Sequence, residues 1–280
     1  MISAFIPNYN QHDYIERAIK SIYEQDVNFN KILVIDDGSN NKKNLDFLKN
    51  YEQVILLKND KNMGRGFCRN LAITELTDPF ILMLDASNFL PRGFTKLGLS
   101  HFKCDQVCAV SGLINNDPNQ NGFCKNWRSR HLFKEEFDFG TEFHNAKSLT
   151  TYGTILRKDS IIKVGNFNKV LRHSEDKDLG KRLLNAGYKI IGDPNLIVYS
   201  MKNDSVLSLL ARYWRWYGGE DEAMSFIDYW NAIKSSIRPM IQQDLKARDW
   251  RAVLVSILCP HYGYARYIYR KITGKLQKTH

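Results

Sequence analysis

Residues Lys31–Ser39 have the sequence KILVIDDGS and give the clearest indication of the fold. The first part of this stretch is a short apolar run typical of a buried strand, and two adjacent carboxylates and an Asp-Gly turn follow at once. Three more runs have the same form, each a short apolar segment that ends in polar or turn residues: Ile2–Ile6, Val54–Lys58 and Phe80–Leu84. The sequence therefore predicts four strands with polar carboxyl ends.

A helix is predicted between the first two of these strands. Asp13 can cap it, and Glu16 can complete a capping box. Its apolar residues fall on one face: Ile15, Ala18, Ile19 and Ile22. The order strand, helix, strand predicts a parallel sheet, and ligands of such sheets bind at the carboxyl ends of the strands. Three polar clusters are expected at that edge: residues 7–10, 36–39 and 85–88.

The second half of the chain is less regular. Residues 115–149 form a polar stretch with scattered aromatic side chains, namely Trp127, Phe133, Phe137 and Phe139. Long irregular segments in compact enzymes are often functional. Periodicity returns later: Asp178–Ala186 is expected to be a helix ended by Gly187, and the chain from Val206 onward is expected to be helical.

Composition sets broad limits on the protein. With 280 residues, 43% of them hydrophobic, the chain can bury the core of one large domain or of one domain with an appendage. Residues 1–10 do not have the pattern of a secretion signal, so none is expected, and the apolar run Ala252–Cys259 is cut short by Pro260. We therefore expect a cytoplasmic protein without a membrane span. The five cysteines, an odd number, are expected to be free thiols.

Charge and motifs narrow the class of partner. The net charge of +10 favours anionic partners, but no nucleic-acid module is recognisable, so no nucleic-acid partner is predicted. Adjacent carboxylates at Asp36 and Asp37 suit the hydrogen-bond donors of a nucleoside. The loop 59–70 has glycines and arginines ahead of a helix, which favours a phosphate. For both segments an ordinary turn or capped loop is the competing interpretation.

Two acidic segments complete the set of candidate residues. Asp85 follows the fourth strand and can hold a divalent cation that bridges a diphosphate; the competing interpretation is a turn at the end of a strand. Glu175, Asp176 and Asp178 open a later helix close to His173. Acidic residues are favoured at a helix start by the helix dipole alone, but their density here also suits a general base.

In this order the motifs resemble those of the family 2 glycosyltransferases, from Ile2 to about Tyr199. The donor-side motifs are Ile6–Asn10, Ile35–Ser39, Asn62–Gly64 and Leu84–Ala86. The acceptor-side motifs are Gly165–Phe167, Glu175–Leu179, Arg182–Leu183 and Gly187–Tyr188. As an ordered set this resemblance is highly specific.

The resemblance implies a GT-A fold of the α/β class: a Rossmann-like mixed sheet flanked by helices, with a helical extension at the carboxyl end. The catalytic domain would span residues 1–205, with a nucleotide-sugar half (1–113) and an acceptor half (114–205), and the basic extension would span 206–280. The implied activity is an inverting hexosyltransferase reaction. It would move a sugar from a nucleoside-diphosphate donor, by resemblance a UDP-sugar, to a hydroxyl of a glycan or lipid-linked acceptor.

The resemblance also assigns roles to residues. Asp176 matches the catalytic base, with Glu175 beside it, and Asp85 sits at the first position of the Asp-X-Asp motif as the metal ligand. The expected donor-binding residues are Pro7, Asn8, Tyr9, Asp36, Asp37, Ser39, Asn62, Gly64, Arg65, Arg69, Asp85, Ala86 and Ser87.

The chain departs from the family pattern at two usual metal contacts. Ser87 stands at the last acid of the Asp-X-Asp motif, and Ser200 stands where a histidine often follows the late strand. A Mn or Mg ion is therefore in doubt as a cofactor. Because a leaving diphosphate still needs its charge balanced, we expect Arg212 or Arg215 to contribute; they lie in a segment, Arg212–Gly219, that distantly resembles the Gln-X-X-Arg-Trp motif.

Two alternatives stay open at the level of the sequence. Basic and aromatic residues alternate near the carboxyl end, which suits either a helix on an anionic membrane at the inner face or ordinary packing with a solvated basic face. Loss of metal contacts also suits a catalytically impaired protein that binds a nucleotide sugar or a glycan on the same fold. Retention of Glu175 and Asp176 argues against that second alternative, because a binding protein needs no base.

Overall fold

The computed structural model describes residues 1–40, 45–134, 142–171, 174–217 and 225–273. By internal contacts the chain divides into two compact units: residues 1–117 with 139–202, and residues 118–138 with 203–280. The predicted boundary near residue 205 lies close to the second junction, but residues 118–138 group with the carboxyl-terminal helices rather than with the acceptor half. Several residues of the predicted segments lie outside the described residues: Phe137, Phe139, His173, Gly218, Gly219 and, among the basic residues near the carboxyl end, Lys275 and Lys278.

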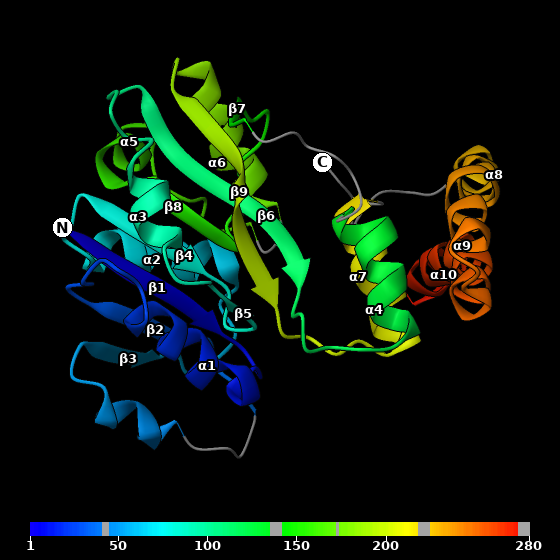
Figure 1. Ribbon diagram of the computed structural model, residues 1–280, viewed down its shortest axis with the longest axis horizontal. Helices are drawn as coiled ribbons and strands as arrows, with labels where there is room; N and C mark the ends of the chain where they lie inside the picture. The colour runs from blue at the N-terminus through cyan, green and yellow to red at the C-terminus, as the bar shows by residue number, and fades with distance from the viewer. Residues whose placement is uncertain (41–44, 135–141, 172–173, 218–224, 274–280) are drawn as a thin grey trace. The chain divides into compact units, whose positions relative to one another are not determined.

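The first unit is built on one mixed sheet (Figure 1). Its strands are β1 Ile2–Asn8, β2 Ile32–Asp36, β3 Val54–Lys58, β4 Phe80–Leu84, β5 Asn88–Phe89, β6 Val107–Asn116, β7 His144–Asn145, β8 Gly153–Arg157 and β9 Lys189–Ser200. Their order is β3-β2-β1-β4-β8-β6-β9-β5, with β7 beside β9. The four predicted strands are confirmed, and β3 and β4 have the predicted bounds.

The sheet combines parallel and antiparallel pairs. The strands β3, β2, β1 and β4 are parallel, as the alternation of strands and helices predicts. Beyond them, β8 is antiparallel to both β4 and β6, while β6 and β9 are parallel. The result is the mixed sheet expected of a GT-A fold.

Helices cover both faces of this sheet (Figure 1). They are α1 His12–Tyr23, η1 Asp46–Asn50, α2 Arg65–Glu75, α3 Phe94–Leu99, α5 Lys158–Lys163 and α6 Glu175–Asn185. Alternation along β1 separates the two cores: Ala4 and Ile6 pack in the cluster that includes α1 and α3, whereas Phe5 packs in the cluster that includes α2, α5 and α6.

The boundaries of two helices differ from those predicted. The predicted capping box at Asp13 and Glu16 is wrong, because α1 is preceded by Gln11 and has no side-chain cap. Its predicted apolar face is confirmed, and all four of those residues are buried. Helix α6 begins three residues earlier than predicted, at Glu175. Gly187 follows its end with a φ of +83°, a conformation that favours glycine.

The second unit is helical. It contains α4 Phe123–Arg128, the π-helical turn η2 Ser129–Phe133, α7 Val206–Tyr217, α8 Phe226–Ser235, the π-helical turn η3 Ser236–Ile241, α9 Gln242–Lys246 and α10 Trp250–Ile272. The helical prediction from Val206 onward is confirmed for the described residues. The irregular stretch predicted at 115–149 is in part wrong, because β6 extends to Asn116 and residues 123–133 are helical. Helix α10 continues through Pro260.

A buried polar network joins residues 118–138 to the carboxyl-terminal helices. The indole N–H of Trp127 donates to Ser256 Oγ (2.8 Å), which donates to Asp244 Oδ2 (2.6 Å). Asp244 Oδ1 also accepts from Arg130 Nε (2.9 Å) and lies 2.8 Å from His131 Nε2. Because Asp244 is fully buried, these partners satisfy a carboxylate that would otherwise be costly. The network explains why this segment belongs to the second unit.

Candidate active site

The candidate site lies at the carboxyl ends of the parallel strands of the first unit. From β1 the chain continues to β2 and β3 on one side, and β4 then pairs on the other side of β1. A reversal of this kind separates the loops that follow neighbouring strands and opens a crevice for ligands. The loops after β1, β2, β3 and β4 hold most of the predicted donor-binding residues.

The loops after β1 and β2 are fixed to each other by hydrogen bonds. Asn8 Nδ2 donates to Asp36 Oδ1 (2.9 Å), and the Ser39 hydroxyl donates to the same oxygen. Ser39 Oγ in turn accepts from the backbone N–H of Asn10 (2.9 Å). Pro7 is the last residue but one of β1, which ends at Asn8, and the side chain of Tyr9 is exposed. The structure thus brings the predicted residues of these two loops together.

Asp37 is bound by the loop that follows β3. Its Oδ1 accepts from Asn59 Nδ2 (2.8 Å) and from the backbone N–H of Met63 (2.8 Å), and its Oδ2 accepts from the backbone N–H of Gly64 (2.9 Å). This buried carboxylate therefore organises the loop 59–64, which contains the predicted Asn62. The loop also packs against Gly38, where a Cβ would come within 2.4 Å of the Lys61 carbonyl carbon.

The turn after β4 places Asp85, Ala86 and Ser87 beside the end of β9. Asn88 pairs with Ser200 across the sheet, and the backbone N–H of Met201 donates to the carbonyl of Ser87 (2.8 Å). The two positions at which usual metal contacts are replaced, Ser87 and Ser200, are therefore neighbours. Asp85 is about one third exposed, whereas Ala86 and Ser87 are buried.

Arg69 connects the β4 turn to the start of α6. It lies in α2, is 2% exposed, and forms an ion pair with the equally buried Glu175. Its Nη2 lies 3.5 Å from Asp85 Oδ1. Burial lowers the pKa of Arg69, and the charge of Asp85 opposes this effect. One guanidinium thus joins the donor-side Asp85 to the segment that carries the predicted base.

The three carboxylates that open α6 have different surroundings. Glu175 is buried against Arg69, and Asp178 forms an ion pair with Arg182 (2.7 Å) one turn further along the helix. Asp176 is half-buried, and its Oδ1 accepts from the backbone N–H of Lys177 (2.8 Å). Of the two predicted catalytic residues, Asp176 is therefore the one accessible to an acceptor.

The remaining predicted residues lie in helices. Arg65 is the exposed first residue of α2, so the predicted loop at 59–70 ends earlier than expected. Arg212 and Arg215 lie in α7 of the second unit. Arg212 is buried, and its Nη2 donates to Asp204 Oδ1 (2.9 Å), while Arg215 is half-buried.

Sequence reasoning missed several residues that hold the site in place. Asn59 binds Asp37, and it is the next polar residue after a strand in the same series as Asp36 and Asp85. Asn70 Nδ2 donates to the carbonyl of Phe167 (2.8 Å), which fixes α2 to the predicted Gly165–Phe167 motif. Asn88 Nδ2 donates to the carbonyl of Tyr152 (2.9 Å). All three lie in or at the ends of predicted segments, 59–70 and 85–88, but the sequence does not show which groups they bind.

Asp85 is the predicted ligand of a divalent cation at this edge. Among the residues that the structure describes, no group of three or more His, Cys, Asp or Glu side chains is arranged to hold a metal. Asp85 alone fits a Mg or Mn ion that takes its other ligands from water and from the phosphates of a substrate, a common arrangement for these ions. Ser87 and Ser200 contribute hydroxyl oxygens at most.

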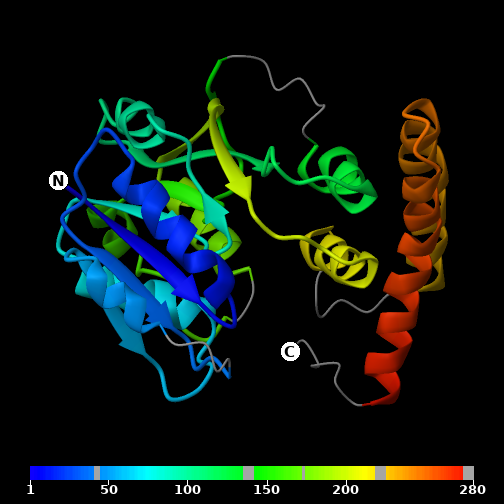
Figure 2. The same ribbon diagram turned by 60° about the horizontal axis from the view of Figure 1, so that its bottom comes forward.

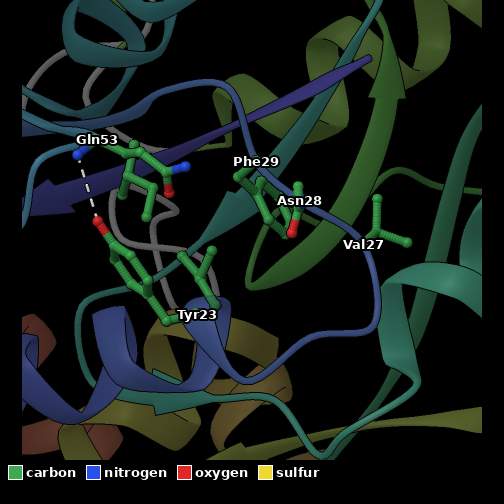
Figure 3. Close-up of a pocket in the computed structure, with 7 residues that line it drawn as sticks. Tyr23, Val27, Asn28, Phe29 and Gln53 are labelled. Carbon is green, nitrogen blue, oxygen red and sulfur yellow. Dashed lines mark hydrogen bonds between the residues drawn. The ribbon is translucent and has the colours of Figure 1, made fainter.

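A separate pocket lies at the opposite edge of the sheet, where β2 and β3 begin (Figure 3). Tyr23 Oη accepts from the backbone N–H of Gln53 (3.3 Å) across it. Its lining residues are Ile22, Tyr23, Val27, Asn28, Phe29, Ile32 and Gln53. It contains no charged side chain and none of the predicted site residues.

Solved structures with this fold include sugar transferases. The mannosyltransferase PcManGT from Pyrobaculum calidifontis, in complex with GDP-Man and Mn²⁺, is similar with a TM-score of 0.61 at 13% identity, covering 98% of this chain and 87% of that chain. TarS 1–349 from S. aureus, in complex with UDP, is similar with a TM-score of 0.56 at 16% identity, covering 98% and 91%. These likenesses confirm the GT-A fold.

Sequence comparison gives the family. An uncharacterized glycosyltransferase of Methanocaldococcus jannaschii is 28% identical over 225 residues, which cover 76% of this chain and 75% of that protein. The family model described as glycosyl transferase family 2 matches residues 3–165, more than half of the chain. The chain is therefore a glycosyltransferase and belongs to glycosyl transferase family 2.

Proposed function

We propose that this protein transfers a sugar from a nucleoside-diphosphate donor, a UDP-sugar by family resemblance, to a hydroxyl of a glycan or lipid-linked acceptor, with inversion at the anomeric carbon. Such a reaction belongs to the synthesis of polysaccharides or glycoconjugates. The observation that carries the proposal is the position of Arg69, which contacts both Asp85 at the donor-side edge and Glu175 next to Asp176.

The donor is expected along the loops that follow β1 and β2. Asp36 and Asn8 provide carboxylate and amide groups at the edge where the parallel strands end, and such groups suit the hydroxyls of a ribose and the N–H groups of a base. Asp37 supports this site by ordering the loop 59–64. Arg65 is exposed at the start of the next helix, where a cation and backbone N–H groups favour a phosphate.

Asp176 is proposed as the general base. Its carboxylate would accept the proton of the acceptor hydroxyl while the acceptor oxygen forms a bond to the anomeric carbon. The bond from that carbon to the diphosphate oxygen would break at the opposite side, and the nucleoside diphosphate would leave with the electron pair. A single displacement of this kind inverts the anomeric centre and needs no covalent intermediate on the protein.

The charge of the leaving diphosphate has two proposed partners. A Mg or Mn ion at Asp85 would act as a Lewis acid on the diphosphate oxygens. Arg215 and Arg212 are the other proposed source of positive charge, although Arg212 already forms an ion pair with Asp204. The single carboxylate at the cation site is the reason to propose both.

The decisive test is a screen for release of nucleoside diphosphate from a panel of nucleotide sugars, with and without Mn²⁺ or Mg²⁺. We expect release from one donor and its loss, by at least about a hundredfold, in Asp176→Asn, since general bases contribute about 10²–10⁴-fold. Asp178→Asn is the matched control: it removes a carboxylate from the same turn of α6, but one that pairs with Arg182. Equal loss in both variants, or full activity in Asp176→Asn, would reject Asp176 as the base.

The single carboxylate of the cation site also supports a second candidate function: a catalytically impaired protein that binds a nucleotide sugar or a glycan. The same screen separates the two functions. A donor that raises the melting temperature without any release, in the presence of a range of glycan and lipid-linked acceptors, would favour the binding function.

A further inference from the structure

The carboxyl-terminal part of the second unit is a helical hairpin, defined here as residues 225–273. Helix α10 runs alongside the rod formed by α8, η3 and α9 (Figure 2). Tyr229 Oη lies 2.8 Å from His261 Nδ1, and the ring of Tyr229 stacks on Tyr264 with centroids 4.4 Å apart. At the other end, Ser256 of α10 donates to Asp244 of α9. These contacts determine which face of α10 packs against the rod.

One face in the first half of α10 is apolar and exposed. Trp250, Leu254 and Leu258 follow one another at intervals of four residues, so they lie along one face of the helix. Their exposed fractions are 69%, 61% and 49%. Val255 and Cys259 on the other side of the helix are buried, so α10 has already packed one apolar face and leaves a second uncovered.

The rod beside α10 also has exposed apolar side chains. Phe226, Trp230 and Ile237 are 52–70% exposed, and α8 has no buried residue. Isolated exposed apolar side chains are common on proteins, but a row of them on each of two adjacent helices marks an interaction surface. The hairpin therefore has a partner-binding surface of apolar character.

The charge of the hairpin identifies the kind of partner. Residues 225–273 contain eight Lys and Arg and three Asp, which gives +5 of the +10 net charge of the chain. Two of the three aspartates add little negative charge to the surface, because Asp244 is fully buried and Asp249 forms an ion pair with Arg130. The charge that the hairpin presents is thus almost entirely basic.

We propose that this hairpin binds the surface of an anionic lipid bilayer, with the aromatic and aliphatic side chains of Trp250, Leu254 and Trp230 inserted at the interface. Helices that combine Trp, Phe and Leu with Lys and Arg lie in the plane of the headgroups, and tryptophan favours that depth. Among the described helices, none is long and apolar enough to cross a membrane. The chemistry therefore indicates attachment to a bilayer surface.

Two other occupants fit the observations less well. A second copy of the chain would bring two strongly basic hairpins together, and like charges oppose such an interface. A nucleic acid would satisfy the charge but would leave the aliphatic row of Leu254, Ile257 and Leu258 without a suitable partner, since stacking on bases is a property of aromatic side chains. A bilayer alone matches the basic and the aliphatic groups together.

This surface would bring the enzyme to acceptors carried on lipids. The binding itself does not depend on the proposed transfer reaction, so it is tested without donor or acceptor. Failure of the binding test would leave the proposed function standing, and failure of the donor screen would leave the membrane surface standing.

The test is co-sedimentation of the purified full chain with vesicles of phosphatidylcholine alone or mixed with phosphatidylglycerol. We expect binding to the mixed vesicles only, weakened by added salt. Leu254→Asp is expected to weaken binding more than about tenfold, because it places a charge at the apolar interface. The matched control is Ile162→Asp, an exposed aliphatic residue on α5 of the first unit, which should bind as the unchanged protein does.

A second pair of variants tests the electrostatic part. Arg251 lies on the exposed side of α10. Arg251→Glu is expected to weaken binding about fivefold or more, since one basic residue near an anionic membrane surface raises the affinity by about that factor. Lys103→Glu in the first unit makes the same change of charge and should have no effect. These positions are exposed, so unchanged melting temperatures will show that the variants are folded.

Three results would overturn the proposal. The first is equal binding of the unchanged protein to neutral and anionic vesicles, or no binding to either. The second is unchanged binding in Leu254→Asp. The third is evidence for another partner. This would be either a dimer in sedimentation that Leu254→Asp converts to a monomer while vesicle binding stays the same, or binding to single-stranded DNA without binding to vesicles.

Discussion

Arg69 and Glu175 form an ion pair in which each side chain is only 2% exposed. The two residues are 106 positions apart in the chain, and their contact joins α2 to the first turn of α6. A buried pair of this kind adds little net stability over an apolar pair of the same size, but loss of one partner leaves a buried charge uncompensated.

This relationship predicts strong coupling between the two positions. We expect Arg69→Met to lower the free energy of unfolding by about 3–5 kcal/mol, because Glu175 then keeps its charge without its main partner. Glu175→Met should also destabilise the protein, whereas the double variant should cost clearly less than the sum of the two. Urea unfolding followed by circular dichroism measures all three. Additive effects would show that the two side chains do not interact.

The cation site gives a second prediction, based on Asp85. In the presence of UDP we expect Mn²⁺ to raise the melting temperature of the unchanged protein, because a ligand that binds only the folded state stabilises it. Asp85→Asn should abolish the rise in melting temperature caused by Mn²⁺ and keep most of the rise caused by UDP. Ser87→Asp adds a second carboxylate beside the first and should tighten Mn²⁺ binding by about tenfold. An increment that persists in Asp85→Asn would place the ion elsewhere.

How much of the fold follows from the sequence depends on the range of the interactions. The strands β1 to β4 are predictable because each is a short apolar run with a local turn signal after it. The helical segment 123–133 is not, because its stabilising partners lie far along the chain: Trp127 contacts Ser256, and Arg130 contacts Asp244. Its polar composition alone indicates a loop.

The same distinction applies to the site. Asp36, Asp37 and Asp85 are predictable because the ends of parallel strands share one edge of the sheet. The ion pair of Glu175 with Arg69 is not, because its two members are far apart in the chain, and it buries Glu175 while the adjacent Asp176 stays half-buried. The failed capping box has a local cause: Asp13 lies inside the first turn of α1, one residue beyond the helix start at His12.

Substitution of Arg212 or Arg215 is expected to lower the activity. Arg212 shares Asp204 with Arg128, at 2.9 Å and 2.6 Å, so Arg212→Ala should lower the free energy of unfolding by about 1–3 kcal/mol as well as the activity. Arg215→Ala should lower kcat/KM by about tenfold or more.

Asp204→Asn provides the control for Arg212, because it removes the same ion pair and keeps the arginine. If Arg212 acts on the diphosphate, Arg212→Ala should raise the KM for the donor well above the value in Asp204→Asn. Equal values in the two variants would show that Arg212 only supports the second unit.

The cysteines provide a prediction that needs no substrate. Burial raises the pKa of Cys68, Cys108 and Cys259 to about 12, whereas Cys104 is exposed. Because the thiolate is the reactive form, a disulfide reagent at mildly basic pH should label Cys104 rapidly in the native protein and leave these three unlabelled. Burial also raises the pKa of Cys124, so this half-buried thiol should react slowly. All five should react after unfolding, and rapid labelling of Cys68 in the native protein would contradict its burial.

The carboxylate of Asp249 is expected to make the stability of the protein depend on pH. It caps α10 by accepting from the backbone N–H of Ala252 (3.1 Å), and it accepts from Arg130 Nη2 (2.8 Å). Burial would raise the pKa of Asp249, but the hydrogen bonds and charge of Arg130 and the Ala252 amide together lower it. A carboxylate whose pKa is lower in the folded state stabilises the protein above its unfolded pKa of about 3.9, and this contribution is lost as the pH falls through the folded value.

The measurement can be restricted to the second unit, because all five tryptophans lie there: Trp127, Trp214, Trp216, Trp230 and Trp250. Asp249→Asn keeps a side chain that can cap the helix and removes the charge. At neutral pH we expect it to lower the free energy of unfolding, followed by tryptophan fluorescence in urea, by about 1–2 kcal/mol. The difference from the unchanged protein should shrink below about pH 4. Asp105→Asn, at a fully exposed carboxylate, is the control. A difference that stays constant from neutral pH to pH values below the folded pKa would mean that the charge of Asp249 does not stabilise the second unit.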